Sequence, residues 1–265
     1  ACVTSTDADH LDIYGDKAPI EASFLEFADK VTDQSTLFVA KGLALKGVSV
    51  AVHEDAKFKA FNVRIENSQY VFDVQTPSEI LTDIRFSLPG THNLMNALMA
   101  LAMAKTYGVA TDDIRKALAS FKGIRRRFSF QIKTDDLVFI DDYAHHPTEI
   151  NAVHQAVREL YPNQKVLAIF QPHLFSRTKD FADGFAQSLS AFDEVILLDI
   201  YPARELPMEG ITSQWLMGKM TNPNVKLVSK TDLILNILKS EARVIVTIGA
   251  GDIGELVKPI KEAIR

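Results

Sequence analysis

The sequence predicts an α/β protein of two domains, the second built on an open, mostly parallel sheet. The chain has 265 residues, which is near the upper size for one hydrophobic core, so two packed domains are expected. After Arg127, short apolar strands alternate with helical segments of about ten or more residues, a pattern typical of a parallel sheet covered by helices on both faces. Before Arg127, strands of alternating polarity lead into a strongly apolar helix.

The first part, residues 1–124, is expected to combine short strands with helices. In order, we expect a helix over 11–31, strands over 37–40 and 47–52, a hairpin of 61–65 and 70–74, a strand over 84–88, and helices over 93–107 and 111–120. Apolar and polar residues alternate in both arms of the hairpin, and 66–69 form its turn. The helix over 93–107 is apolar nearly all round and should be deeply buried. Thr111 is expected to cap the last helix.

The second part, residues 125–265, should hold the parallel sheet. Strands are expected over 137–140, 166–170, 195–199, 225–228 and 244–248, with helical segments between them. The composition changes near 123–128, and we place the domain boundary between residues 124 and 125.

The composition excludes several classes of protein. The net charge of −5 gives no overall electrostatic attraction for nucleic acid or an anionic membrane. No apolar run approaches the length of about 18 residues that a membrane span needs, and no signal peptide is recognisable. Cys2 is the only cysteine, so an intramolecular disulfide and a thiolate metal cluster are ruled out, which suits the cytoplasm.

Chemically active side chains follow the predicted strands of the second part. The segments concerned are 141–149, 171–177, 199–205 and 249–252, which hold paired Asp, paired His, a third His and Arg177. In an open α/β sheet, ligands bind beyond the carboxyl ends of the strands, so we expect these side chains to converge on one rim. Loop polarity and helix capping explain Thr148 and Ser176, but not this set of residues as a whole.

Two glycine and amide motifs leave alternatives open. Residues 249–254 fit G-x-G-x-x-G, but too little chain follows for a dinucleotide fold, so the turn either brings backbone amides and a helix N-terminus near an anion or holds no ligand. Asn93 and Asn96 share a face at a helix start, where their amides suit a purine edge or serve capping and solvation.

Cationic and metal-binding candidates lie at the boundary and near the start. Arg125, Arg126 and Arg127 either reach a phosphate or form a solvated basic linker. His10, between Asp9 and Leu11, is a possible ligand of Mg²⁺ or Mn²⁺, although a lone His is more often structural.

Taken together, these segments resemble the Mur ligases over essentially the whole chain. The matching segments are 9–12, 89–97, 121–128, 141–149, 170–178, 201–205 and 249–252. The stretch around Tyr143 and His145 resembles the branch that adds L-alanine or its relative that recycles a tripeptide.

The resemblance implies the latter part of a P-loop-type ATPase domain, followed by a Rossmann-like ligase domain. It implies an enzyme that uses ATP and Mg²⁺ to join L-alanine to the carboxylate of UDP-N-acetylmuramate through an acyl phosphate, in cytoplasmic peptidoglycan synthesis. By this likeness Tyr143, His145, His173 and Arg177 are catalytic, with Arg, protonated His and metal supplying positive charge. The residues implied to bind the nucleotide are His92, Asn93, Asn96, Arg127 and Asp142, and His10 is the implied metal ligand.

The sequence also departs from the family pattern. The loop G-x-x-x-x-G-K-[ST] is absent, so we expect a C-terminal fragment that lacks the uridine-binding region and is inactive alone. Leu174 and Arg204 stand where relatives usually carry Arg and Gly, and residues 5–7 replace Asn-Ile-Glu.

Three other hypotheses remain: the tripeptide-adding relative, a two-metal phosphoesterase that uses Asp141, Asp142, His145, His146 and His173, and a non-catalytic anion-binding module.

Overall fold

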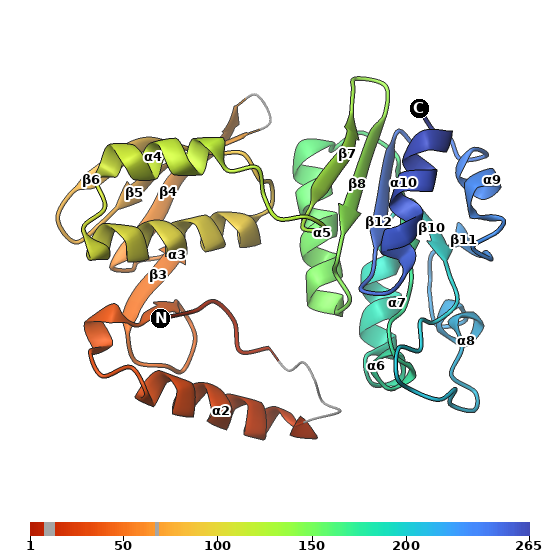
Figure 1. Cartoon of the computed structure of the whole chain (residues 1–265), viewed down its shortest axis with the longest axis horizontal. Helices are drawn as coiled ribbons and strands as arrows, with labels where there is room; N and C mark the ends of the chain where they lie inside the picture. The colour runs from red at the N-terminus through yellow and green to blue at the C-terminus, as the bar shows by residue number, and fades with distance from the viewer. Residues whose placement is uncertain (8–13, 67–68) are drawn as a thin grey trace. The chain divides into compact units, whose positions relative to one another are not determined.

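The computed structural model describes residues 1–7, 14–66 and 69–265, and they form two compact units, Ala1–Lys122 and Gly123–Arg265 (Figure 1). The division falls two residues before the predicted boundary. Each unit has hydrophobic clusters of its own, and each is described separately below.

The first unit is built on one six-stranded sheet in the order β1-β2-β3-β4-β5-β6. The strands are β1 (Cys2–Val3), β2 (Phe38–Ala40), β3 (Val48–Val52), β4 (Phe58–Glu66), β5 (Gln69–Gln75) and β6 (Ile80–Phe86). The pairs from β1 to β4 are parallel, whereas β4-β5 and β5-β6 are antiparallel. The predicted hairpin is therefore confirmed.

Among the described residues of this unit, four helical segments accompany the sheet: α2 (Lys17–Asp29), the 3₁₀ turn η1 (Gln34–Thr36), α3 (Thr91–Tyr107) and α4 (Thr111–Ser120). The helix α3 packs against β2, β3 and β4 and buries Leu94, Leu98 and Leu101, as its apolar sequence predicted. Thr111 does not cap α4. Ala110 occupies the cap position, and the Thr111 hydroxyl accepts a hydrogen bond from Lys105 Nζ at 2.7 Å.

The second unit contains a six-stranded sheet in the order β11-β10-β9-β12-β8-β7. The strands are β7 (Ser129–Lys133), β8 (Val138–Asp142), β9 (Val166–Phe170), β10 (Glu194–Leu197), β11 (Val225–Leu227) and β12 (Val244–Ile248). All pairs are parallel except β7-β8. The mostly parallel sheet is as predicted, but the antiparallel edge strand β7 was not, although Phe130 and Ile132 alternate there with polar residues.

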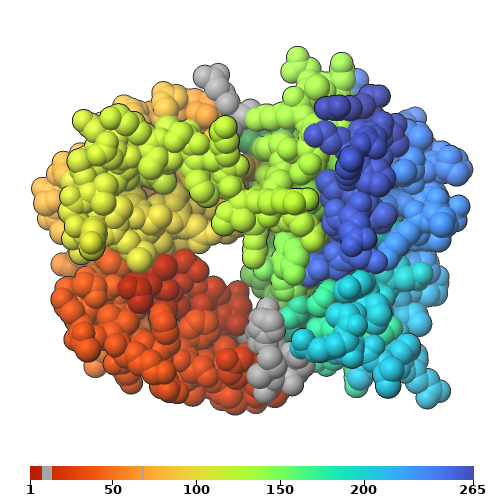
Figure 2. Space-filling model, in the orientation of Figure 1, coloured from red at the N-terminus to blue at the C-terminus, as the bar shows by residue number. Residues whose placement is uncertain are grey.

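Six helices belong to this unit: α5 (Pro147–Leu160), α6 (Phe175–Asp180), α7 (Ala182–Ser190), α8 (Ser213–Met217), α9 (Leu233–Ile237) and α10 (Ile253–Ala263). Two hydrophobic clusters draw on alternate residues of the central strands and on different helices, so both faces of the sheet are covered. On one face of the unit, α10 lies beside the β7–β8 hairpin (Figures 1 and 2). No helix in the described ranges is long and apolar enough to span a bilayer.

Candidate functional site

The four polar segments of the second unit leave the sheet at the same edge. The strand β12 lies between β8 and β9, with Ile248 paired to both Asp142 and Phe170, and β10 joins β9 through Leu197 and Phe170. Because these strands are parallel, their carboxyl ends share one edge. An isolated parallel bridge between His173 and Tyr201 then joins two of the following loops.

Tyr143 lies against two guanidinium groups at this edge. The Cζ atoms of Arg126 and Arg127 are 5.0 and 5.9 Å from the centre of its ring. Arg126 also donates to the Gly249 carbonyl at 2.6 Å and to Asp141 Oδ2 at 3.2 Å. Arg126 is therefore committed to internal contacts, whereas Arg127, half exposed and 3.8 Å from Glu149 Oε1, keeps a guanidinium that an anion can reach.

His145 is fixed by Tyr143 and Glu149. Its Nδ1 lies 2.9 Å from the Tyr143 carbonyl oxygen and 3.5 Å from Glu149 Oε2. The same carboxylate oxygen accepts the backbone N–H groups of His145 at 2.8 Å and His146 at 3.2 Å. His146 is the N-cap of α5, and Glu149 completes a capping box with it, with Pro147 at the first turn. The start of α5 therefore sets the position of His145.

His173 lies between His145 and Tyr201. Its ring stacks on Tyr201 with centroids 5.7 Å apart, and the His145 ring is 6.3 Å away. Burial, followed by the nearby Arg177 and His145, lowers the pKa of His173 to about 4. Its Nδ1 is buried and has no hydrogen-bond partner within the described part of the chain. The expectation that protonated His supplies charge here is therefore wrong for His173, which is neutral at pH 7.

Arg177 is 6% exposed and lies on the short helix α6. Glu205 holds the start of that helix, because its carboxylate accepts the N–H groups of Phe175 at 2.5 Å and Ser176 at 3.0 Å, together with the Ser176 hydroxyl. Leu174, at the N-cap, is buried and has a φ of 67°. The loop after β10 therefore positions the helix that carries Arg177.

Both carboxyl groups at the end of β8 are buried. Asp142 accepts the backbone N–H groups of Phe128 at 2.7 Å and Ala144 at 2.8 Å, and burial raises its pKa to about 6. Asp141 accepts from Thr247 Oγ1 at 2.9 Å and from Arg126, and burial raises its pKa as well. Among the residues described, no three His, Cys, Asp or Glu side chains form a group that could hold a metal ion, so the phosphoesterase hypothesis gains no support from this geometry.

The glycine turn after β12 is filled by the protein's own groups. Gln171, which is fully buried, accepts the N–H of Ile253 at 2.9 Å and donates to Asp252 Oδ1 at 2.7 Å. Lys230 pairs with the other oxygen of Asp252, and a Cβ on Gly251 would lie 2.4 Å from Gln171 Oε1. A carboxylate thus already occupies the start of α10, which favours the alternative that this turn holds no anion.

The three candidates of the first unit lie in the first two turns of α3. His92 and Asn96 are exposed, and Asn93 Nδ2 donates to the Pro89 carbonyl oxygen at 2.7 Å. Asn93 therefore does not cap the helix, because Gly90 takes that position with a φ of 94°. His10 lies outside the described residues.

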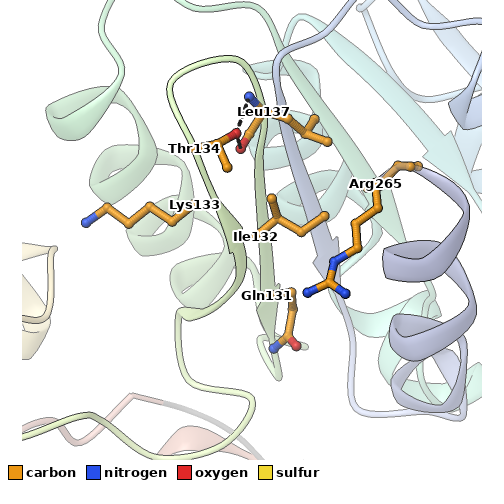
Figure 3. A pocket seen from close by; sticks show the side chains of 7 residues that line it. Gln131, Ile132, Lys133, Thr134, Leu137 and Arg265 are labelled. Atoms are coloured by element: carbon orange, nitrogen blue, oxygen red, sulfur yellow. Dashed lines mark hydrogen bonds between the residues drawn. The ribbon is translucent and has the colours of Figure 1, made fainter.

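A cavity of about 450 Å³ lies away from this rim, between the β7–β8 hairpin and the end of α10 (Figure 3). It opens near the beginning of β8, and its polar lining includes Gln131, Lys133 and Arg265. None of the predicted site residues lines it.

Sequence reasoning did not predict the contacts that hold the site in place, which are made by Arg126, Glu149, Gln171 and Glu205. One of them carried a local signal, since Glu149 stands three residues after His146, the spacing of a capping box. Gln171 and Asp252 are 81 residues apart, so only the folded structure reveals their contact.

Known proteins match both parts of the chain. The Mur ligase middle domain matches residues 1–104, and the domain described as "Mur ligase, glutamate ligase domain" matches residues 126–251. A curated UDP-N-acetylmuramate–L-alanine ligase of Flavobacterium johnsoniae is 73% identical over 265 residues, and that of Christiangramia forsetii is 61% identical over 264. Each alignment covers the whole of this chain, which spans 59% and 58% of the length of these two relatives.

Solved structures agree on the fold. The UDP-N-acetylmuramate–alanine ligase of Thermotoga maritima superposes with a TM-score of 0.78 at 22% identity, covering 99% of this chain and 59% of that one. A murein peptide ligase of Psychrobacter arcticus has a TM-score of 0.63 at 21% identity, covering 99% and 57%. With two successive Mur ligase domains in their order and relatives at 61–73% identity, the chain belongs to the Mur ligase family.

Proposed function

We propose that the polypeptide carrying this chain is an ATP-dependent ligase that joins L-alanine to the carboxylate of UDP-N-acetylmuramate during peptidoglycan precursor synthesis in the cytoplasm. One observation carries the proposal: a chain 73% identical to a curated ligase of that name gathers Tyr143, His145 and His173 at the carboxyl edge of a parallel sheet. A carboxylate resists attack by an amine, so phosphoryl transfer from ATP must first convert it to an acyl phosphate.

The residue roles follow from charge and exposure. We assign Arg127 to the nucleotide phosphates, because its guanidinium is half exposed while that of Arg126 is committed to Asp141 and Gly249. Arg177, near His173, is assigned to the charge that spreads over the phosphoryl group in the transition state. His92, Asn93 and Asn96 are assigned to the adenine.

We assign Asp142 to nucleotide binding by the second unit. Its two oxygens accept the backbone N–H groups of Phe128 and Ala144, the residues that directly follow Arg127 and Tyr143, so the carboxylate fixes the backbone beside both side chains. Mg²⁺ remains a prediction. The described residues contain no three-residue group for a metal ion, and the assigned ligand His10 lies outside them, so we derive no step through a metal.

The proposal is tested by measuring phosphate release from the complete gene product that contains this sequence. We expect turnover that requires ATP, UDP-N-acetylmuramate and L-alanine together. The 265-residue chain alone is expected to stay at background, because no G-x-x-x-x-G-K-[ST] loop, which grips the β- and γ-phosphates, occurs in it. Turnover by the chain alone at ordinary enzyme rates, or by the complete protein without UDP-N-acetylmuramate, contradicts the proposal.

The acceptor is tested in the same assay. L-alanine is compared with a tripeptide as the attacking amine, each at saturating ATP and UDP-N-acetylmuramate. A higher kcat/KM for L-alanine supports the proposed function, and a higher value for the tripeptide assigns the protein to the recycling relative.

A further inference from the structure

The position of one proton in the rim is fixed by geometry. His145 Nδ1 lies 2.9 Å from the carbonyl oxygen of Tyr143, and a carbonyl oxygen can only accept a hydrogen bond. Nδ1 must therefore carry the hydrogen. In the neutral imidazole, the lone pair then lies on the other nitrogen, Nε2.

A carboxylate stands beside the protonated nitrogen. Glu149 Oε2 is 3.5 Å from His145 Nδ1 and accepts the backbone N–H of His145 at 2.8 Å. The His145 side chain is 13% exposed and that of Glu149 is 35% exposed, so water screens the pair only in part. A negative charge at this distance stabilises the imidazolium that forms when Nε2 gains a proton.

The other charged and titratable groups around His145 do not replace this carboxylate. Arg127 faces the second oxygen of Glu149 at 3.8 Å, His146 is its neighbour in the chain, and the Tyr143 ring is 5.3 Å away. His173, 6.3 Å away with Arg177 behind it, is a poor proton acceptor at pH 7, because its pKa is lowered to about 4. Of the two imidazoles that face each other in the rim, His145 is thus the one suited to take up a proton.

We propose that His145 Nε2 accepts a proton from the ammonium group of the incoming amino acid, and that Glu149 is the positioning residue that keeps the other proton on Nδ1. The proposal rests on the ligase function proposed above. The amine nitrogen forms the C–N bond to the acyl carbon, the C–O bond to the phosphate breaks, and its electron pair leaves with the phosphate. Of the two protons that the nitrogen loses, one goes to Nε2 and the other leaves on the phosphate as HPO₄²⁻.

The first test is an NMR measurement of the 265-residue chain with ¹⁵N-labelled histidine, and it requires no catalysis. We expect His145, assigned by His145→Gln, to show the Nδ1–H tautomer near neutral pH. Glu149→Gln should increase the fraction of the Nε2–H tautomer, because the carboxylate that favours a hydrogen on Nδ1 is removed. Gln also completes a capping box, so the start of α5 is retained.

The matched control is Glu159→Gln, the same change in the last turn of the same helix, where the carboxylate accepts from Gln155 Nε2. The control should leave the tautomer of His145 unchanged. An Nε2–H tautomer in the unmodified chain, or an unchanged tautomer in Glu149→Gln, overturns the proposal.

The second test separates the two half-reactions in the complete protein. Acyl phosphate formed without amino acid is trapped with hydroxylamine, and we expect Glu149→Gln to slow this step less than the step that consumes L-alanine. The kcat/KM for L-alanine should fall at least tenfold, since a positioned proton acceptor contributes roughly 10²–10⁴-fold.

A merely structural role for Glu149 predicts a different result, in which both half-reactions slow together and the tautomer of His145 does not change. That result overturns the proposal. A complete protein that forms no acyl phosphate refutes the proposed function and the proton transfer with it, while the NMR measurement still decides whether Glu149 and His145 form the pair.

Discussion

Individual residues in the rim owe their chemistry to burial. Asp142 and His173 are both driven towards their neutral forms, with pKa values of about 6 and about 4, and desolvation is the largest cause in each case. Asp142 remains in place because two backbone N–H groups bind its carboxylate. From residue type alone, Asp142 would be expected to lose its proton near pH 3.8 and His173 near pH 6.5. The folded chain moves both pKa values away from these positions.

The raised pKa of Asp142 predicts a pH-dependent stability. The folded chain holds this proton up to about pH 6, whereas the unfolded chain releases it near pH 3.8, so stability falls as the pH rises through this window. A shift of about two units corresponds to a loss of roughly 3 kcal/mol. Urea unfolding followed by Trp215 fluorescence at pH 4 and pH 7 measures the loss.

The control for this prediction is Asp142→Asn, whose side chain does not titrate. The free energy of unfolding of the unmodified chain minus that of the variant isolates the contribution of Asp142, since the other groups titrate in both proteins. We expect this difference to be smaller at pH 7 than at pH 4, and an equal difference at the two values contradicts the prediction.

At the scale of elements, two helix starts in the second unit are held by side chains from distant parts of the chain. Glu205, from the loop after β10, binds the start of α6, and Gln171, from the end of β9, binds the start of α10. The N-terminus of a helix leaves N–H groups unsatisfied, so each of these contacts fixes the helix relative to a strand end. The rim is therefore one connected set of elements.

Substitution of Gly251 tests the connection between the strand ends and the start of α10. In Gly251→Ala the new Cβ would lie 2.4 Å from Gln171 Oε1 and 2.8 Å from Tyr201 Cβ, so Gln171 and Tyr201 must move. We expect a loss of about 1–3 kcal/mol in the free energy of unfolding, measured in urea by Trp215 fluorescence.

Gly218→Ala is the control for this prediction. Its Cβ would come no closer than 3.4 Å to another atom, the backbone oxygen of Trp215, and it should change stability by less than about 0.5 kcal/mol. Equal stabilities of the two variants refute the prediction.

At the scale of the whole molecule, each hydrophobic cluster found among the described residues belongs to one unit. The clusters of the first unit draw on residues up to Leu118, and those of the second on residues from Phe128 onwards. Each unit therefore has a core that can drive folding by itself.

We accordingly expect residues 123–265 to fold without the first unit. Trp215, the single tryptophan of the chain, lies in this unit and reports its unfolding alone. The isolated segment should unfold cooperatively in urea, with the midpoint that Trp215 reports in the 265-residue chain. A segment without a cooperative transition shows that its stability depends on residues 1–122.

The sequence by itself determined the elements and the family. Periodicity located the hairpin, the buried helix α3 and the five parallel strands, because these signals depend on neighbouring residues. The polar segments after the strands identified the rim, and their resemblance to the Mur ligases named the family. The cap of α4 was assigned one residue too late, since Ala110 gave no capping signal, and β7 was missed as a short edge strand.

Only the tertiary structure decided which side chains meet. It placed β12 between β8 and β9, paired Gln171 with Asp252 across 81 residues, and buried His173 until its neutral form prevailed. Strand order, burial and long-range hydrogen bonds depend on how distant segments pack, and this information is not local in the chain. For that reason the sequence could supply candidate residues such as His145, whereas the proton position on its ring required the fold.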